Sequence, residues 1–214
     1  MEKPNDNRIE LERKFWNSKA KSYDKVVSKF LPKFYETILV NLIQDVSQSK
    51  KVLDAAAGTG ILSIEMSEHV SHITAIDIAP EMLNVAKEKS ARMQKYNIDF
   101  EVGDICNLKF DNKSFDTVVA SNVLHLLFNP RVALLEISRV LTDQGKIITA
   151  TGCYGANLRT KILSQIFALL GQKARSKWSQ KSLKEFIEKN GFAITKEVYI
   201  NGTIPLIYLV ASKK

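Results

Sequence analysis

Three acidic side chains follow three successive predicted strands of this chain. Asp54 closes the apolar run 52–53, Asp77 follows the run 73–76, and Asp104 comes after the run 98–102 and one glycine. Parallel strands place their carboxyl ends at one edge of a sheet, and open α/β sheets bind ligands outside that edge. The three carboxylates are therefore expected along one ligand-binding rim, where they could accept hydrogen bonds from hydroxyl, amino or ammonium groups.

A turn of small residues follows the first of these strands and contains Gly58 and Gly60. Small side chains let a ligand lie against bare backbone, and glycine permits a tight turn from strand to helix. In a dinucleotide site such a turn faces a pyrophosphate, which backbone N–H groups and the helix dipole favour. The carboxylate of Asp54 would repel that anion. It suits a ligand with an ammonium group and no phosphate, such as S-adenosylmethionine, and Asp77 lies near the offset of about 20 residues expected for a ribose-binding acid.

Residues 51–151 resemble the nucleotide-binding core of a class I S-adenosylmethionine-dependent methyltransferase. The pattern Asp-x-Ala-x-Gly-Thr-Gly at 54–60 is similar to the branch that contains the ubiquinone and menaquinone C-methyltransferases, and so is Trp-x-x-x-Ala-x-x-Tyr-Asp at 16–24. The resemblance implies an α/β fold with a Rossmann-like, mostly parallel seven-stranded sheet. An antiparallel strand in a C-terminal hairpin, helices on both faces and an N-terminal helical cap complete this expected fold.

Each part of the methyl donor can be matched to residues in such a site. Asp54 would lie near the methionine ammonium, Asp77 would accept both ribose hydroxyls, and Asp104 would accept from the adenine amino group. Capping, turn-forming and core roles are the alternatives for these acids and for the apolar side chains. The complete set expected to bind the donor is Tyr23, Asp54, Ala55, Ala56, Gly58, Thr59, Gly60, Asp77, Ile78, Met82, Asp104, Ile105, Ser121 and Asn122.

The segment from Ser121 to His125 follows the fourth predicted strand and is expected to face the sulfonium and the methyl acceptor. It lacks the Asn/Asp-Pro-Pro-Tyr/Phe motif of enzymes that methylate adenine or glutamine amino groups, which counts against those acceptors. His125 is the histidine placed to act as a catalytic base, because an unperturbed imidazole titrates near neutral pH. The alternative is a histidine bonded to backbone. No metal site is expected.

The periodicity and the turn residues predict strand–helix alternation followed by a hairpin. We expect one structural domain, with a helical cap at 1–50 and a donor-binding part at 51–214 that carries a lid over 154–178. The predicted helices cover 8–46 with a break at Pro32, 61–70, 80–96, 130 to Gln144-Gly145, and 179–190; the later strands cover 115–121, 146–151, 192–200 and 204–210.

Composition and charge limit the classes of function that this chain can have. The chain has 214 residues, 45% hydrophobic and 25% charged, with a net charge of +8, and the segment 156–214 carries most of the excess of lysine and arginine. No secretory signal, membrane span or metal-type cysteine spacing is visible, so a cytoplasmic protein is expected. The expected partner is a small-molecule substrate, apolar or anionic, and not DNA. RNA methylation, a nicotinamide-dependent oxidoreductase and a non-catalytic cofactor-binding protein stay as alternatives, and the oligomeric state is left open.

Overall fold

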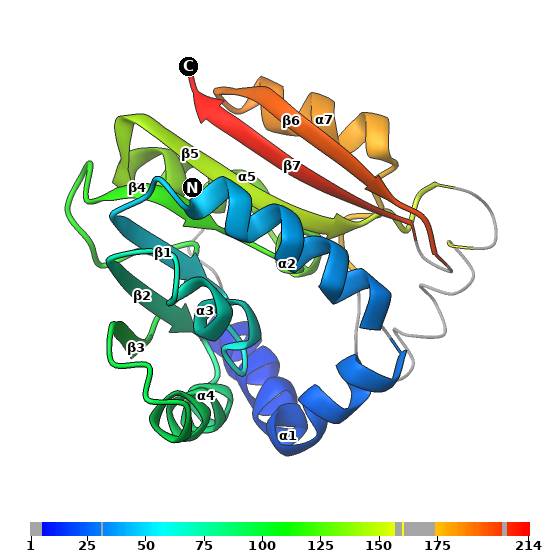
Figure 1. Ribbon diagram of the computed structural model, residues 1–214. Coiled ribbons are helices and arrows are strands. Elements are labelled where there is room, and N and C mark those ends of the chain that lie inside the picture. Colours follow the sequence, from blue (N-terminus) through cyan, green and yellow to red (C-terminus); the bar gives the residue numbers. More distant parts are fainter. Residues whose placement is uncertain (1–5, 31, 157–159, 161–173, 203–204) are drawn as a thin grey trace. The chain divides into compact units, whose positions relative to one another are not determined.

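The computed structural model describes residues 6–30, 32–156, 160, 174–202 and 205–214 (Figure 1). Its seven strands form one sheet in the order β3-β2-β1-β4-β5-β7-β6. The pairs β1–β2, β2–β3 and β4–β5 are parallel, whereas β7 is antiparallel to both β5 and β6. This confirms the predicted mostly parallel, seven-stranded sheet. The strands are β1 Lys51–Ala55, β2 His72–Asp77, β3 Ile98–Val102, β4 Phe115–Val119, β5 Leu141–Gly152, β6 Phe192–Ile200 and β7 Leu206–Lys213.

The chain divides into two compact units, of which the first is Met1–Asp104. It holds β1 to β3 and the helices α1 Asp6–Phe30, α2 Pro32–Val46, α3 Ile61–Met66 and α4 Pro80–Arg92. Helix α4 lies against β2 and β3, and α1 lies along α4 (Figure 1). Nearly every residue of β1 and β2 is buried, as expected for parallel strands covered on both faces.

The second unit, Ile105–Lys214, contains β4 to β7 with η1 Leu124–Leu126, α5 Pro130–Val140 and α7 Gln180–Lys189. Asn129 caps α5 by accepting from the Val132 N–H, and Ser179 caps α7 through a reciprocal bond with Ser182. Such caps satisfy N–H groups that have no partner inside the helix. The predicted starts of both helices are confirmed. None of the helices in the described ranges is long and apolar enough to cross a membrane.

Several predicted boundaries were wrong, and the largest error concerns the end of α5. This helix ends at Val140, and β5 begins at Leu141, which is extended and pairs with Phe115. The register then shifts before Lys146 pairs with Thr117, so the predicted helix end at Gln144-Gly145 lies in an irregular part of β5. A polar bulge in a strand and a helix C-terminus look alike in sequence, because both favour glycine.

Three other elements end at least two residues earlier than predicted. Helix α3 ends at Met66 instead of residue 70, and α4 ends at Arg92 instead of residue 96. Gln94 adopts a left-handed φ of 55°, which stops the helical hydrogen bonding, as left-handed residues commonly do after helices. Strand β4 ends at Val119, two residues before the predicted end at Ser121.

Candidate functional site

The structure places the three predicted acids at the carboxyl ends of three neighbouring parallel strands of the first unit. Asp54 lies in β1, and Asp77 ends the adjacent β2. The register pairs Asp77 with Val102 of β3, and Asp104 follows two residues later. The strand-end rim expected from the sequence is therefore present, within one compact unit.

The glycine-rich turn between β1 and α3 has an unusual backbone. The φ angles of Ala56, Gly58 and Gly60 are 92°, 57° and 73°, all in the left-handed region. A Cβ added at Gly58 would meet no atom within 4 Å, so the backbone there is open on that side. A Cβ at Gly60 would lie 2.9 Å from the Cβ of Ala86 in α4. Gly58 thus leaves room for a ligand, whereas Gly60 permits close packing against α4.

Replacing Gly60 by alanine is expected to destabilise the protein by about 3 kcal/mol, from backbone strain and from the clash with Ala86. Gly191→Ala is the matched control, because Gly191 has a φ of 94° but open space around its missing Cβ. That variant should lose only the strain, about 1–2 kcal/mol. Urea unfolding of both variants measures the difference, and equal losses would contradict the packing role of Gly60.

Ala56 is strained, because an alanine occupies a φ that glycine adopts at little cost. Its N–H and that of Ala57 both donate to the Ile76 carbonyl, at 2.9 and 2.8 Å, which holds the turn in place. Ala56→Gly is expected to stabilise the protein by about 1 kcal/mol by releasing this strain. Ala57→Gly, at a position without a positive φ, should instead destabilise it by about 0.5–1 kcal/mol. Thermal unfolding of the two variants checks this opposition in sign.

Asp54 is a buried carboxyl group, 2% exposed, and accepts a hydrogen bond from the Ser63 hydroxyl at 2.5 Å. Burial raises the pKa of Asp54 to about 7, the Ser63 bond opposes that shift, and the charge of Asp77 adds to it. A buried carboxylate with such a raised pKa gains stability when a cation approaches it. Sequence reasoning missed Ser63 as a partner of this acid.

Asp77 is 9% exposed, and both of its carboxylate oxygens accept backbone hydrogen bonds. The Gly58 N–H donates to Oδ2 and the Ala79 N–H donates to Oδ1, each at 2.9 Å. Burial raises the pKa of Asp77, and these backbone bonds oppose the increase. Each oxygen has a further lone pair with which it could bind a ligand hydroxyl.

Several other predicted donor-binding residues of the first unit are buried or pack against buried side chains. Met82 is buried with Ala20 and Ala79, and Tyr23, Trp16 and Ile78 pack against this cluster. The Tyr23 hydroxyl lies 3.2 Å from the Tyr35 hydroxyl. Ala55 and Thr59 are also buried, and Asp104 is half-buried. Met82 therefore shows the core packing that was the alternative to adenine contact.

The second unit carries the remaining predicted residues, Ile105, Ser121, Asn122 and His125. Ile105 is buried, and Asn122 adopts a left-handed φ of 55° while its N–H donates to the Ala150 carbonyl at 2.7 Å. Asparagine tolerates this conformation better than most residues. Within the described residues, two buried polar atoms of this segment have no hydrogen-bond partner: Ser121 Oγ and His125 Nδ1.

His125 is 3% exposed, and its ring lies 5.4 Å from the ring of Tyr154. Burial lowers the pKa of His125 to about 4, so the imidazole is neutral at pH 7 and is a weaker base than a free imidazole. Its carbonyl accepts from the N–H groups of Arg175 and Ser176, at 2.8 and 3.1 Å. These bonds hold residues 175 and 176 beside His125, whereas most of the expected lid at 154–178 lies outside the described residues.

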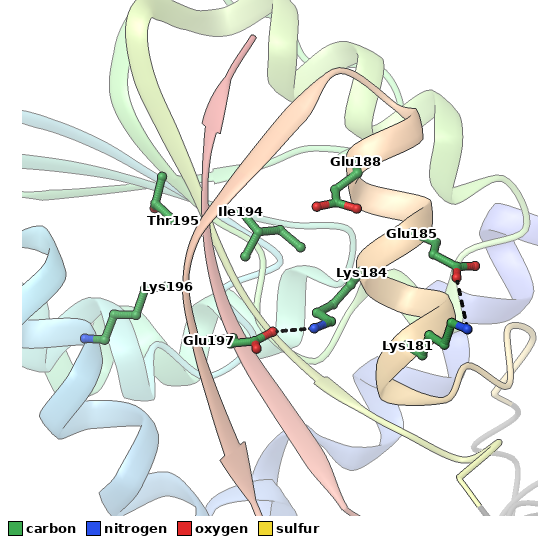
Figure 2. Close-up of a pocket in the computed structure, with 8 residues that line it drawn as sticks. All are labelled: Lys181, Lys184, Glu185, Glu188, Ile194, Thr195, Lys196 and Glu197. Atoms are coloured by element: carbon green, nitrogen blue, oxygen red, sulfur yellow. Dashed lines mark ion pairs between the residues drawn. The ribbon is translucent and has the colours of Figure 1, made fainter.

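A separate groove of the second unit lies between α7 and β6 (Figure 2). Its charged side chains balance one another: Lys184 pairs with Glu197 at 2.8 Å, and Lys181 approaches Glu185 at 4.0 Å. None of the predicted site residues lines it. The mixed charge gives this groove no preference for an anionic ligand.

Comparisons with known proteins identify a methyltransferase domain by sequence and the same fold by structure. A family model described as a methyltransferase domain matches residues 46–191. A demethylmenaquinone methyltransferase of Staphylococcus aureus is 28% identical, with 97% of this chain and 95% of that protein aligned. The corresponding protein of Deinococcus radiodurans is 32% identical over 58% of this chain and 56% of its own length. A crystal structure of an S-adenosylmethionine-dependent methyltransferase from Aquifex aeolicus superposes with a TM-score of 0.70 at 18% identity, covering 92% of this chain and 98% of that one.

Proposed function

We propose, from the premise that this chain belongs to the family of S-adenosylmethionine-dependent methyltransferases, that its methyl acceptor is a small molecule. The observation that carries this proposal is the alignment with a demethylmenaquinone methyltransferase over nearly the full length of both chains. That alignment includes the N-terminal helices as well as the sheet. The name of this relative suggests an acceptor with a quinone ring, which carries ring hydroxyls in its reduced, quinol form.

The residues of the first unit fit the methyl donor. The buried carboxyl group of Asp54 suits the methionine ammonium, and the open backbone at Gly58 leaves space for the methionine arm. The two oxygens of Asp77 suit the two ribose hydroxyls. We assign these three contacts to the donor, with Asp104 and the Ile105 N–H assigned to adenine.

Methyl transfer from a sulfonium asks little acid–base chemistry of the protein. The chemistry supplied by the bound donor is a methyl carbon already activated for in-line displacement. The protein has to align the acceptor and keep water out. We assign the acceptor contact to the segment after β4, where Ser121 Oγ and His125 Nδ1 are buried without partners among the described residues. Leaving such atoms unpaired costs about 1–3 kcal/mol each, which a bound acceptor with a polar oxygen would recover.

The neutral state of His125 leads to a prediction about catalysis. His125→Phe keeps a ring but removes Nδ1, and it is expected to lower kcat/KM by about 10- to 100-fold through the lost hydrogen bond. His125→Asn, whose amide group replaces the Nδ1 atom, should keep more of the activity. Because the pKa of His125 is about 4, its titration should not shape the pH profile between pH 6 and 8. An inflection near pH 6.5 that disappears in His125→Phe would contradict this assignment.

A panel of acceptors tests the proposed function. Purified protein is incubated with S-adenosylmethionine and with naphthoquinols, simple phenols, small amines or total RNA, and S-adenosylhomocysteine formation is measured. We expect turnover with a small molecule, with ring-hydroxyl compounds best. Methylation of RNA alone, with salt-sensitive RNA binding, would overturn the proposal. The protein would then be an RNA methyltransferase, the alternative that the basic segment 156–214 suggests.

A further inference from the structure

One face of α1 contacts three segments of the same compact unit: the residues after β2, the start of α4 and the glycine-rich turn. Arg13 Nε donates to the Ile78 carbonyl at 3.1 Å, and Asn17 Oδ1 accepts from the Glu81 N–H at the start of α4 at 3.0 Å. Ala20 and Asp24 continue this face, since the spacings of four, three and four residues repeat along one side of a helix. Asp24 is the last residue of the pattern Trp-x-x-x-Ala-x-x-Tyr-Asp, and no role has been assigned to this residue so far.

Asp24 connects α1 to the glycine-rich turn. Its Oδ1 accepts from the Thr59 hydroxyl at 2.5 Å, and its Oδ2 accepts from Lys89 Nζ of α4 at 2.6 Å. Thr59 is 1% exposed and lies between two glycines, so it is the residue of 58–60 whose side chain can anchor the turn. Lys89 in turn fixes the orientation of the Asp24 carboxylate.

The turn is thus held by two carboxylates. Asp77 of β2 holds the Gly58 N–H, and Asp24 of α1 holds the adjacent Thr59 hydroxyl. Glycine-rich backbone has more conformational freedom than any other, so its position depends on such bonds. Productive alignment of a methyl donor is sensitive to displacements of about 1 Å.

We propose that Asp24 is a positioning residue for the methyl donor, and that it acts through Thr59 on the turn that receives the methionine arm. The inference rests on the proposed assignment of this turn to the methionine arm. It predicts an effect on ligands that carry that arm, S-adenosylmethionine and S-adenosylhomocysteine, and none on adenosine. Through Asp24, the N-terminal helix becomes a functional part of the donor site.

Calorimetry on the full chain tests the proposal with four single variants and one double variant. Asp24→Ala and Thr59→Val each remove the hydroxyl bond, and each should weaken S-adenosylhomocysteine binding about tenfold while adenosine affinity stays within twofold. The double variant should bind S-adenosylhomocysteine no more weakly than either single variant, because the two substitutions remove the same bond. Asp24→Asn keeps an oxygen that can accept from Thr59, and Thr59→Ser keeps the hydroxyl, so both should restore most of the affinity.

Two controls separate positioning from general stability. Glu10→Ala removes an exposed ion pair with Lys14 on the same helix and should leave the affinities for S-adenosylhomocysteine and adenosine unchanged. Unfolding in urea reports the fraction folded for every variant. The proposal is overturned if folded Asp24→Ala and Thr59→Val bind S-adenosylhomocysteine within twofold of the original chain, or if adenosine affinity falls equally.

The assignment of the turn is tested separately by Gly58→Val, whose side chain would enter the open space beside the backbone. Because Gly58 has a left-handed φ of 57°, this variant also carries backbone strain, and its binding is compared only after urea unfolding shows that it is folded. Weaker S-adenosylhomocysteine binding by this variant, together with unchanged binding by Asp24→Ala, would reject the role of Asp24 and keep the assignment. Unchanged binding by Gly58→Val would reject the assignment and, with it, the inference.

Discussion

Asp77→Asn is expected to weaken S-adenosylmethionine binding by about 100-fold, which corresponds to about 3 kcal/mol. The charged carboxylate would accept from both ribose hydroxyls, and hydrogen bonds to charged groups contribute about 1.5–3 kcal/mol each. The amide has one accepting oxygen, and its NH₂ group would face the N–H of Gly58 or Ala79, which now donates to Asp77. Titration calorimetry with S-adenosylmethionine measures the loss.

Asp99→Asn is the matched control for this variant. Asp99 belongs to the neighbouring strand β3, is largely exposed and pairs with His72 at 3.1 Å, so the same chemical change occurs outside the proposed site. Its donor affinity should remain that of the original chain. Equal affinities of Asp77→Asn and Asp99→Asn would remove Asp77 from the donor site.

The rim of acids at the strand ends could be predicted from the sequence because it depends on local patterns. An acid at the end of an apolar run, followed by small residues, marks a strand end and a turn, and the parallel sheet then brings successive strand ends together. The structure confirms this placement for Asp54, Asp77 and Asp104. The caps of α5 and α7 were predictable for the same reason, since Asn129 and Ser179 precede their helices directly.

The partners of these acids could not be predicted, because they depend on packing between distant elements. The bond from Thr59 to Asp24 joins residues 35 positions apart. Helix α2 and strand β1 lie between them in the chain, and no spacing rule links α1 to the turn after β1. The Trp-x-x-x-Ala-x-x-Tyr-Asp pattern at 16–24 was the signal that could have pointed to Asp24. The unpaired Nδ1 of His125 also follows from burial, which the sequence does not display.

The raised pKa of Asp54 makes the stability of the free protein depend on pH. Its pKa is about 7 in the folded state and near 3.9 in an unfolded chain, so the folded state binds more protons between these values. The contribution of this group to the free energy of unfolding is fully present below about pH 4. It decreases progressively as the pH rises to and through 7, by about 4 kcal/mol in all. Ionising this carboxyl in its buried position is therefore a cost that the free protein bears at pH 8.

Asp54→Asn is expected to remove this cost and to stabilise the free protein at pH 8 by about 2 kcal/mol, after allowing for the buried amide NH₂. At pH 4 the variant should have no such advantage, because the original carboxyl is then protonated. Urea unfolding without ligand at both pH values measures the two differences. A variant that is less stable than the original chain at pH 8 would show that Asp54 is a structural anchor instead.

Asp54→Asn should have opposite effects on the two properties at pH 8: the free protein becomes more stable, and S-adenosylmethionine binds more weakly. The original chain should bind S-adenosylmethionine more tightly as the pH rises from 6 to 8, because the ammonium group favours the ionised carboxyl. Asp54→Asn should bind about 10- to 100-fold more weakly at pH 8 and lose this pH dependence. A carboxylate that destabilises the free fold and that a cationic donor would stabilise is the expected reason why a buried acid lies at the end of β1.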